Sequence, residues 1–336
     1  MASSKVYVRN LQLTGNATYT ISVPKEWARR LNLERGSRVY LEVMQDGSLR
    51  VYSHPSKRVN TATKTFELDR GDDPESLLRR IIAAYLAGFS SVTLKFNPEM
   101  KEVALNLRRV LESSVLGFNV LSESKSEFTF YTVIDEESMS LSEALRKLKL
   151  NVHHMLEDTL AGINSSEAKV LERVIEEDQI VDRLYLLITK QVTSMLLNPF
   201  IVREHGLVSA AETPHLFLAA RSMERISDHA VLIARESLEA ISEGRKIPKW
   251  LSDDFRKAIE LFDLTGDLLF EPSEGEAEEL ARRIGSALRE IASRKIEDSK
   301  IQLLANSIER VLGYSMNIVE AVIDMMMIRE YLRIAT

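Results

Sequence analysis

The stretch LFLAARSMERISDHAVLIARESLE, residues 216–239, predicts one long helix around which the rest of the chain is organised. It contains no proline or glycine, and it is apolar around much of its circumference. Glu224 and Asp228 stand four residues apart in it, which places both carboxylates on one helix face, one turn apart. Because Phe217 and Val231 share that side, we do not expect it to be a simple solvated face.

A second stretch, residues 167–190, repeats this arrangement upstream. Asp178 and Asp182 are again four residues apart, and they lie in the middle of an apolar stripe at helical spacing. The stripe consists of Leu171, Val174, Ile175, Val181, Tyr185 and Ile188. Charged carboxylates at such positions are costly unless a counter-charge or a ligand compensates them.

Two interpretations of these acid pairs remain open. Together the pairs offer four hard oxygen ligands, which suit a divalent or trivalent cation. The alternative is a set of buried salt bridges with Arg183, Arg221 or Arg225 as partners. We favour the metal site, because two salt-bridged pairs would not need a common spacing.

Both stretches resemble motifs of a known family. The run MERISDHA at 223–230, followed by Ile233 and Ala234, resembles the signature of the PhoU family of phosphate-uptake regulators, and VIEEDQIVDRL at 174–184 resembles that family's earlier motif. The resemblance covers roughly residues 140–336 and implies two three-helix bundles in tandem. It also implies iron- or zinc-type metal clusters held by these acid pairs, here Asp178, Asp182, Glu224 and Asp228.

The composition limits the class of protein. A chain of 336 residues has room for two or three domains, and 45% hydrophobic with 28% charged residues is typical of a globular protein. The absence of cysteine excludes disulfides, thiolate metal sites and cysteine nucleophiles. We find no signal peptide and no window of 18 uninterrupted apolar residues, so we expect a cytoplasmic protein without membrane insertion.

The charge is distributed unevenly along the chain. Residues 1–60 contain ten Lys or Arg against four Asp or Glu, a balance of +6, whereas the whole chain carries −6. A basic first domain in front of an acidic body indicates that the first domain meets a polyanion.

Residues 1–55 predict a small domain of short strands. We expect a short helix over 25–31 after Pro24, a hairpin turn at Asp46-Gly47, and strands over 5–13, 19–23, 38–43 and 49–52. A domain of this size has little core of its own, so we expect it to be stabilised as a homodimer.

This order resembles the AbrB-type swapped-hairpin DNA-binding domain, in the form that is fused to PhoU-like regions in archaeal proteins. The matching residues are Val8-Arg9, Gly15, Ser22-Val23-Pro24, Glu26-Trp27, Arg29-Arg30-Leu31, Leu33, Gly36, Val39 and Gly47. The resemblance implies a barrel of interleaved hairpins whose surface binds double-stranded DNA, with Arg9, Lys25, Arg29 and Arg30 as the candidate contacts. The sequence departs from the family after Gly15, where an arginine is common, which puts base readout there in doubt. The alternative role of each basic residue is surface solubility.

A polar, proline-marked linker is expected over 54–62, followed by a small α/β module over 62–136. The pattern is β-α-β-α-β-β, with strands over 63–68, 92–96, 119–122 and 127–134 and helices over 73–86 and 98–113. It predicts a split sheet with both helices on one face. The module contains no P-loop, GxSxG or HExxH motif, and we interpret it as a dimerisation or sensing module.

Residues 140–336 predict an all-α region of two tandem three-helix bundles, 140–245 and 250–336. The expected helices are 141–162, 166–195, 212–242, 252–269, 275–295 and 298–334. An internal repeat aligns the second bundle with the first. In this alignment Asp178, Asp182 and Asp228 become Ala287, Ile291 and Gly313, and only Glu224 keeps an acid, Glu309. We therefore expect one metal cluster, in the first bundle.

Two further groups need an interpretation. Asp263 and Asp267 are also four apart, but we interpret them as acids on a solvated face. His153-His154 could direct one imidazole toward the acid pairs, although a partly buried structural role is favoured.

The chain is thus predicted to be multidomain: a swapped-hairpin β domain, an α/β module and an all-α PhoU-like region. The function we favour is a DNA-binding transcriptional regulator of phosphate uptake or metabolism, with a metal-bearing body that senses a signal or binds a partner. The alternative is a signalling adaptor that docks on the phosphate ABC transporter, without a role on DNA. We disfavour an enzyme, because no base or nucleophile accompanies the acids.

Overall fold

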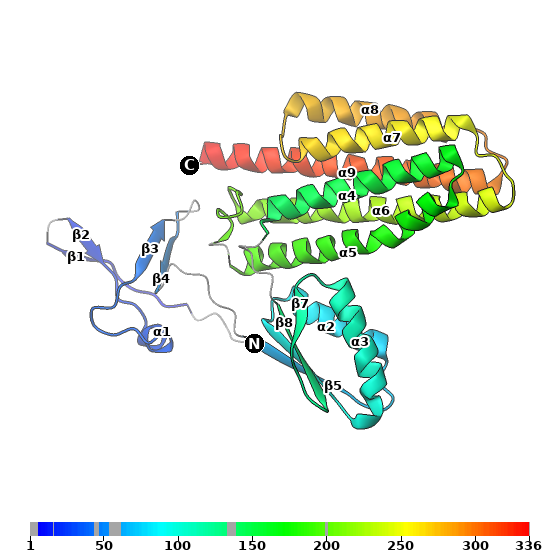
Figure 1. Ribbon diagram of the computed structural model, residues 1–336. Coiled ribbons are helices and arrows are strands. Elements are labelled where there is room, and N and C mark those ends of the chain that lie inside the picture. The colour runs from blue at the N-terminus through cyan, green and yellow to red at the C-terminus, as the bar shows by residue number, and fades with distance from the viewer. Residues whose placement is uncertain are drawn as a thin grey trace. The chain divides into compact units, whose positions relative to one another are not determined.

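The structure is a computed structural model, and it describes residues 6–15, 17–43, 47–53, 62–132, 139–198 and 201–335. The chain divides into two compact units, residues 1–58 and residues 59–335 (Figure 1). The expected linker, apart from Ala62, lies outside the described residues, as does Asp46 of the expected hairpin turn.

The first unit contains two antiparallel hairpins and one short helix. Its elements are β1 (Gln12–Thr14), β2 (Thr18–Thr20), α1 (Lys25–Arg30), β3 (Tyr40–Val43) and β4 (Leu49–Tyr52). β1 pairs with β2 and β3 with β4, and Gly15 and Gly47 adopt the positive φ angles that glycine tolerates best. α1 begins directly after Pro24, whose fixed φ suits the start of a helix.

The first expected strand is wrong over most of its length. Residues 6–11 have no regular secondary structure, and only Gln12–Thr14 forms a strand, because within one chain only the short β2 is available to pair with it. No residue of α1 is buried. Large apolar side chains remain exposed across this unit, among them Val6, Val8, Leu11, Tyr19, Leu41 and Val43.

The second unit begins with the α/β module. Its elements are β5 (Thr63–Leu68), α2 (Pro74–Leu86), β6 (Ser91–Phe96), η1 (Pro98–Met100), α3 (Lys101–Ser114), β7 (Phe118–Glu123) and β8 (Glu127–Thr132). The strand order is β5-β6-β8-β7, with β5 and β6 parallel and the other pairs antiparallel. The expected β-α-β-α-β-β order is confirmed, but the sheet is not split, because β5 and β6 are direct neighbours.

The core of this module lies between the sheet and its helices. Both helices contact the sheet and each other (Figure 1). Alternate strand residues face them, and aromatic rings fill the interior: Phe118 stacks on Phe130 at 5.1 Å, and Phe96 lies 4.8 Å from Phe128. α2 is capped by Asp73, whose carboxylate accepts hydrogen bonds from the backbone N–H groups of Glu75 and Ser76.

The remainder of the second unit is helical. Its helices are α4 (Leu141–Ser165), α5 (Ala168–Leu197), α6 (Thr213–Ser242), α7 (Lys249–Leu268), α8 (Glu274–Ala292) and α9 (Ser299–Ala335), with a short 3-10 helix, η3 (Ala210–Glu212), before α6. α4, α5 and α6 pack on one another, as do α7, α8 and α9. α6 packs on α9 and α4 on α7, so the two bundles share one continuous hydrophobic core. The tandem three-helix bundles predicted from the sequence are therefore confirmed.

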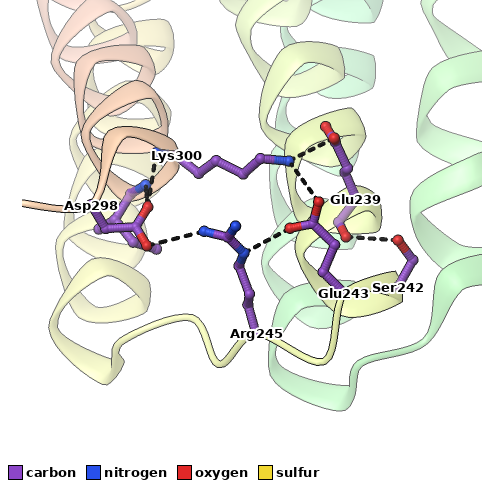
Figure 2. Close-up of polar contacts among 7 residues, drawn as sticks. Glu239, Ser242, Glu243, Arg245, Asp298 and Lys300 are labelled. Carbon is purple, nitrogen blue, oxygen red and sulfur yellow. Dashed lines mark hydrogen bonds and ion pairs between the residues drawn. The ribbon is translucent and has the colours of Figure 1, made fainter.

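A polar network joins the end of α6 to the start of α9 (Figure 2). Nζ of Lys300 lies 2.7 Å from Oε1 of Glu239, while the guanidinium of Arg245 bridges Glu243 at 2.6 Å and Asp298 at 3.2 Å. Asp298 also caps α9, since its Oδ1 accepts hydrogen bonds from the backbone N–H groups of the second and third helical residues. The network thus combines a helix cap with ion pairs between the two bundles.

By length and composition, α9 is the one helix of the described residues that could cross a membrane. It packs against α6, α7 and α8, and its apolar side chains supply the centre of the shared core. Because a helix between two bundles is buried on several sides, its apolar composition follows from its place in the fold.

Candidate functional site

The four predicted acidic residues gather where α5 and α6 pack on each other. α5 carries Asp178 and Asp182, and α6 carries Glu224 and Asp228. They are close enough to affect one another's ionisation: Asp182 interacts with Asp178 and Asp228, and Glu224 with Asp228 and Asp182. We refer to these four residues as the acid cluster.

Two arginines of α6 engage the acid cluster. Nη1 of Arg221 lies 2.7 Å from Oε1 of Glu224, and Nη1 of Arg225 lies 2.9 Å from Oδ2 of Asp228. Each arginine precedes its acid by three residues, so the pairs form along one face of the helix. Two of the three arginine partners considered from the sequence therefore do form ion pairs. Nε of Arg183, the third candidate, is buried and has no hydrogen-bond partner.

The arginines do not satisfy the whole cluster. Oε2 of Glu224 is buried without a hydrogen-bond donor, although Nε of Arg225 approaches to 3.8 Å, and Oδ1 of Asp178 is likewise buried and unsatisfied. Unsatisfied buried carboxylate oxygens are costly, and they are where a cation or a proton would be stabilised.

Burial and mutual repulsion shift the ionisation of the cluster. Desolvation, together with the charge of Asp228, raises the pKa of Glu224 to about 7, against the opposing effect of Arg221 and Arg225. Desolvation and the charges of Asp178 and Asp228 raise the pKa of Asp182 to about 6. Desolvation also raises the pKa of Asp178, despite the nearby hydroxyl of Ser227. The positive charge of the nearby arginines therefore does not offset the burial and mutual repulsion of the four acids.

The donor set suits a hard cation, since it consists of carboxylate oxygens and two of them are buried and unsatisfied. In the arrangement seen here, however, no three His, Asp or Glu side chains of the described residues are grouped to hold a metal ion. Oxygens of Glu224 and Asp228 are instead engaged by arginines. The metal cluster thus remains a prediction about these residues.

A pocket of about 310 Å³ opens beside the acid cluster, between the α/β module and the first bundle. The module contributes Ile82 of α2 and Ser113 and Ser114 of α3, and the bundle contributes Asp182 and Glu224, among others. The two serines could not be predicted as site residues from sequence patterns, because their place depends on how α2 and α3 pack on α5. No local motif encodes such a contact.

The second bundle contains no counterpart of the acid cluster at the aligned positions. Ala287 and Ile291 are buried in the hydrophobic core, and a side chain at Gly313 would meet open space. Glu309 is a single half-buried acid.

The remaining sequence candidates lie elsewhere. The solvated-face interpretation fits Asp267, whose side chain is 64% exposed, better than Asp263, which is half-buried; both pair with Nζ of Lys149 across the α4–α7 contact, at 3.1 and 2.5 Å. Nδ1 of His153 lies 3.3 Å from Asp263, which agrees with a structural role. The ring of His229 lies 5.9 Å from that of Tyr314 in α9, and burial lowers its pKa.

The four candidate DNA contacts are all exposed on the first unit. Lys25, Arg29 and Arg30 belong to α1, with the first two one turn apart on the same side. Arg9 lies before β1; its Nη1 donates a hydrogen bond to the carbonyl of Val8 at 2.8 Å, and its guanidinium lies 5.5 Å from the centre of the Tyr7 ring.

Comparison with known proteins identifies two regions of the chain. Residues 145–237 match the family model of the PhoU domain, and residues 12–59 match that of MazE, a bacterial antitoxin described as an antidote-toxin recognition protein. No curated protein matches the chain. The chain thus combines a PhoU-like helical body with an N-terminal domain of the MazE/AbrB-like class, as the sequence resemblances predicted.

Two solved structures are similar to part of this chain. PhoU from Pseudomonas aeruginosa is 18% identical, with a TM-score of 0.47 over 55% of this chain and 95% of that one. The phosphate transport system regulatory protein PhoU from Streptococcus pneumoniae is 16% identical, with a TM-score of 0.46 over 55% and 92%.

Proposed function

We propose that this chain is a cytoplasmic, DNA-binding transcriptional regulator of phosphate uptake rather than an enzyme. The observation that carries the proposal is the presence of a PhoU-domain region at 145–237 and an antitoxin-type region at 12–59 in one chain. In this proposal the first region confers the link to phosphate, and the second confers binding to double-stranded DNA as a homodimer.

The charge distribution supports a role on DNA. The first 60 residues carry a balance of +6 in a chain of net charge −6, and α1 displays Lys25, Arg29 and Arg30 on its exposed surface. Cations that neutralise phosphates supply most of the sequence-independent affinity of such proteins. The exposed apolar side chains of the same unit support the homodimer, because a second copy would cover them.

A gel-shift assay with the full-length chain tests this function. The probe is the DNA upstream of the phosphate-transport genes, and a scrambled duplex of equal length is the competitor. We expect a shift that responds to phosphate, and we expect the Arg29→Ala/Arg30→Ala variant to lose it. The matched control is Arg282→Ala/Arg283→Ala, which removes two exposed arginines from α8 in the helical body.

A second candidate is a signalling adaptor that docks on the phosphate transporter. It is supported by the same PhoU-domain match, which lies entirely within the acidic helical body. The two candidates differ in the gel shift: no shift at any phosphate level, together with co-purification of transporter subunits, would favour the adaptor.

We further propose that the acid cluster binds one iron- or zinc-type metal cluster, with Asp178, Asp182, Glu224 and Asp228 as ligands. The unsatisfied buried oxygens of Asp178 and Glu224 support this proposal. Binding would require Glu224 and Asp228 to exchange their arginine partners for the metal. Such a metal would supply positive charge to a cluster that lacks it.

A further inference from the structure

The last turns of α9 carry an uncovered apolar stripe. They project past the ends of α7 and α8, the other two helices of the second bundle (Figure 1). The side chains of Met327, Tyr331 and Ile334 are 44%, 70% and 75% exposed, and their spacing of four and three residues places them on one face of the helix. Met325, on the opposite face, is buried in the shared core. We refer to the three exposed residues as the tail stripe.

The helix that carries the tail stripe is anchored to the bundle. Arg329 pairs with the buried Glu212 at 2.6 Å, and Oδ2 of Asp324 lies 3.3 Å from Nδ1 of His215. Both partners lie at or just before the start of α6. The tail stripe therefore begins on a fixed surface, and a partner would lose little free energy in ordering it.

The place of α9 in the fold does not explain these three residues. Burial between the bundles accounts for the apolar composition of the rest of the helix, but it does not extend to the tail stripe. Single exposed apolar side chains are common on protein surfaces. Three that line one helix face are instead typical of a helix that packs on a partner.

We propose that the tail stripe packs on the same stripe of a second copy of this chain, with the two α9 ends antiparallel about a two-fold axis at Tyr331. The two Tyr331 rings then face each other, and Met327 of each copy meets Ile334 of the other. The stripe is therefore complementary to itself. The same rotation brings Glu330, which lies beside the stripe, toward Arg333 of the other copy, so opposite charges meet at the rim.

The size of the tail stripe favours a second copy over an independent protein. Three side chains bury far less than the roughly 1,200 Å² of a stable interface between separate proteins. A small contact becomes effective when its partner is already held nearby, because little further entropy is lost. The homodimer through the first unit would supply such a partner, so this inference rests on that part of the proposed function.

Cysteine cross-linking of the full-length protein tests the contact. The chain contains no cysteine, so one introduced thiol reports on one position. With copper-phenanthroline, which takes two electrons and two protons from two facing thiols, Tyr331→Cys should yield a disulfide-linked dimer. The matched control is Glu320→Cys, exposed on the same face about three turns upstream, whose two copies would lie about 33 Å apart along the axis. Cross-linking of Tyr331→Cys that is no stronger than that of Glu320→Cys would overturn the proposal.

A mixed pair of cysteines tests the antiparallel order. Met327→Cys and Ile334→Cys are coexpressed with different affinity tags, and each should cross-link to the other more than to itself. The reason is that only the mixed pair meets across the two-fold axis. A preference of each variant for its own kind would indicate parallel helices and would refute this arrangement.

Dimer strength in solution provides a second measurement. Tyr331→Glu brings two carboxylates together and should weaken dimerisation of the full-length protein about tenfold in sedimentation equilibrium. Leu303→Glu, at an exposed apolar residue near the start of α9, should not. Because Tyr331 is exposed, both variants should keep the melting temperature of the unchanged protein. Equal dimer strength in the two variants would contradict the proposal.

The remaining outcomes separate this inference from the proposed function. A dimer that persists without Tyr331→Cys cross-linking would assign dimerisation to the first unit alone, which refutes this contact and leaves the regulator intact. A monomeric protein would refute both the contact and the homodimer. Binding to phosphatidylcholine–phosphatidylglycerol vesicles that Tyr331→Glu abolishes, without cross-linking, would assign the tail stripe to a membrane surface and overturn the proposal.

Discussion

Glu212, which is buried, forms an ion pair with the partly exposed Arg329 between the segment before α6 and the last turns of α9. Nε and Nη2 of Arg329 each lie 2.6 Å from Oε2 of Glu212, and the exposed fraction of Glu212 is 0%. The other oxygen of Glu212 accepts hydrogen bonds from the backbone N–H groups of Val208 and Ser209, at 2.7 and 3.0 Å. One carboxylate therefore ties the connection between α5 and α6 to the C-terminal part of α9.

Glu212→Gln should destabilise the helical body by about 2 kcal/mol. The amide keeps the shape but removes the charge, which leaves Arg329 without its counter-ion beside a buried site. Arg329 is 38% exposed in its side chain, so water offsets part of the loss. Chemical denaturation measures the free energy of unfolding, with Glu278→Gln on the exposed surface of α8 as control. Equal free energies in the two variants would contradict this role for Glu212.

Asp298→Ala should lower the melting temperature, and Asp298→Asn should lower it less. Both variants break the ion pair with Arg245, but asparagine retains an acceptor for the backbone N–H groups of Lys300 and Ile301. Those hydrogen bonds hold the pKa of Asp298 below its ordinary value. Stability from this group is therefore present at neutral pH and is lost as the pH falls through the folded-state pKa. Thermal scans at neutral and acidic pH measure it, and identical melting temperatures for the Ala and Asn variants would exclude the cap as the cause.

The free energy of unfolding should fall as the pH rises from about 4.5 to about 7 in the presence of a chelator. The reason is that burial raises the pKa of Glu224 from its ordinary value of 4.5 to about 7, so in this range the folded state binds more protons than the unfolded state. The protonated Glu224 contributes up to about 3 kcal/mol to the free energy of unfolding. This contribution is fully present below the ordinary pKa of 4.5 and is lost above the folded-state pKa of about 7. Chemical denaturation across this pH range should show that the free energy of unfolding of Glu224→Gln declines less steeply with pH than that of the unchanged protein. A decline of the same steepness in that variant would assign the effect to other groups.

Metal content should correspond to one cluster per chain. Only the first bundle contains the four acids, whereas the second has Ala287, Ile291 and Gly313 at the aligned positions. Elemental analysis should find iron, zinc or a similar metal, and Asp182→Asn or Glu224→Gln should remove most of it. Chelation should lower the melting temperature, because the acids then repel one another.

The second bundle supplies a control for this prediction. Gly313→Asp alone should restore no second site, since its partners on α8 are apolar. A protein without bound metal, or one whose content is unchanged in both acid variants, would show that the acids serve only in ion pairs.

The helical elements could be predicted closely from the sequence. α6 was expected over 212–242 and spans Thr213–Ser242, because its apolar periodicity is long and Pro214 and Gly244 lie near its ends. The same holds for the strands of the α/β module, such as β5, in which the buried Phe66 and Leu68 alternate with the exposed Thr65 and Glu67. Local sequence patterns are therefore enough to predict most of the helices and strands.

The predictions that were wrong or missing concern features that depend on contacts between residues distant in sequence. The strand expected over 5–13 shortened to Gln12–Thr14, since strand formation needs a partner and not only a propensity. Lys149 was not recognised as the counter-ion of Asp263 and Asp267, because they are more than a hundred residues apart. Ser113 joined the pocket through the packing of α3 on α5, which no periodicity reveals.

Regulation of phosphate-transport genes is tested most directly by genome-wide mapping of where the full-length protein binds DNA, in cells grown with abundant and with scarce phosphate. We expect peaks upstream of phosphate-transport genes that change with phosphate supply. Arg29→Ala/Arg30→Ala should abolish these peaks, and Arg282→Ala/Arg283→Ala should not. Binding without enrichment at such genes, or no binding above background at either phosphate level, would show that the protein does not regulate them from DNA.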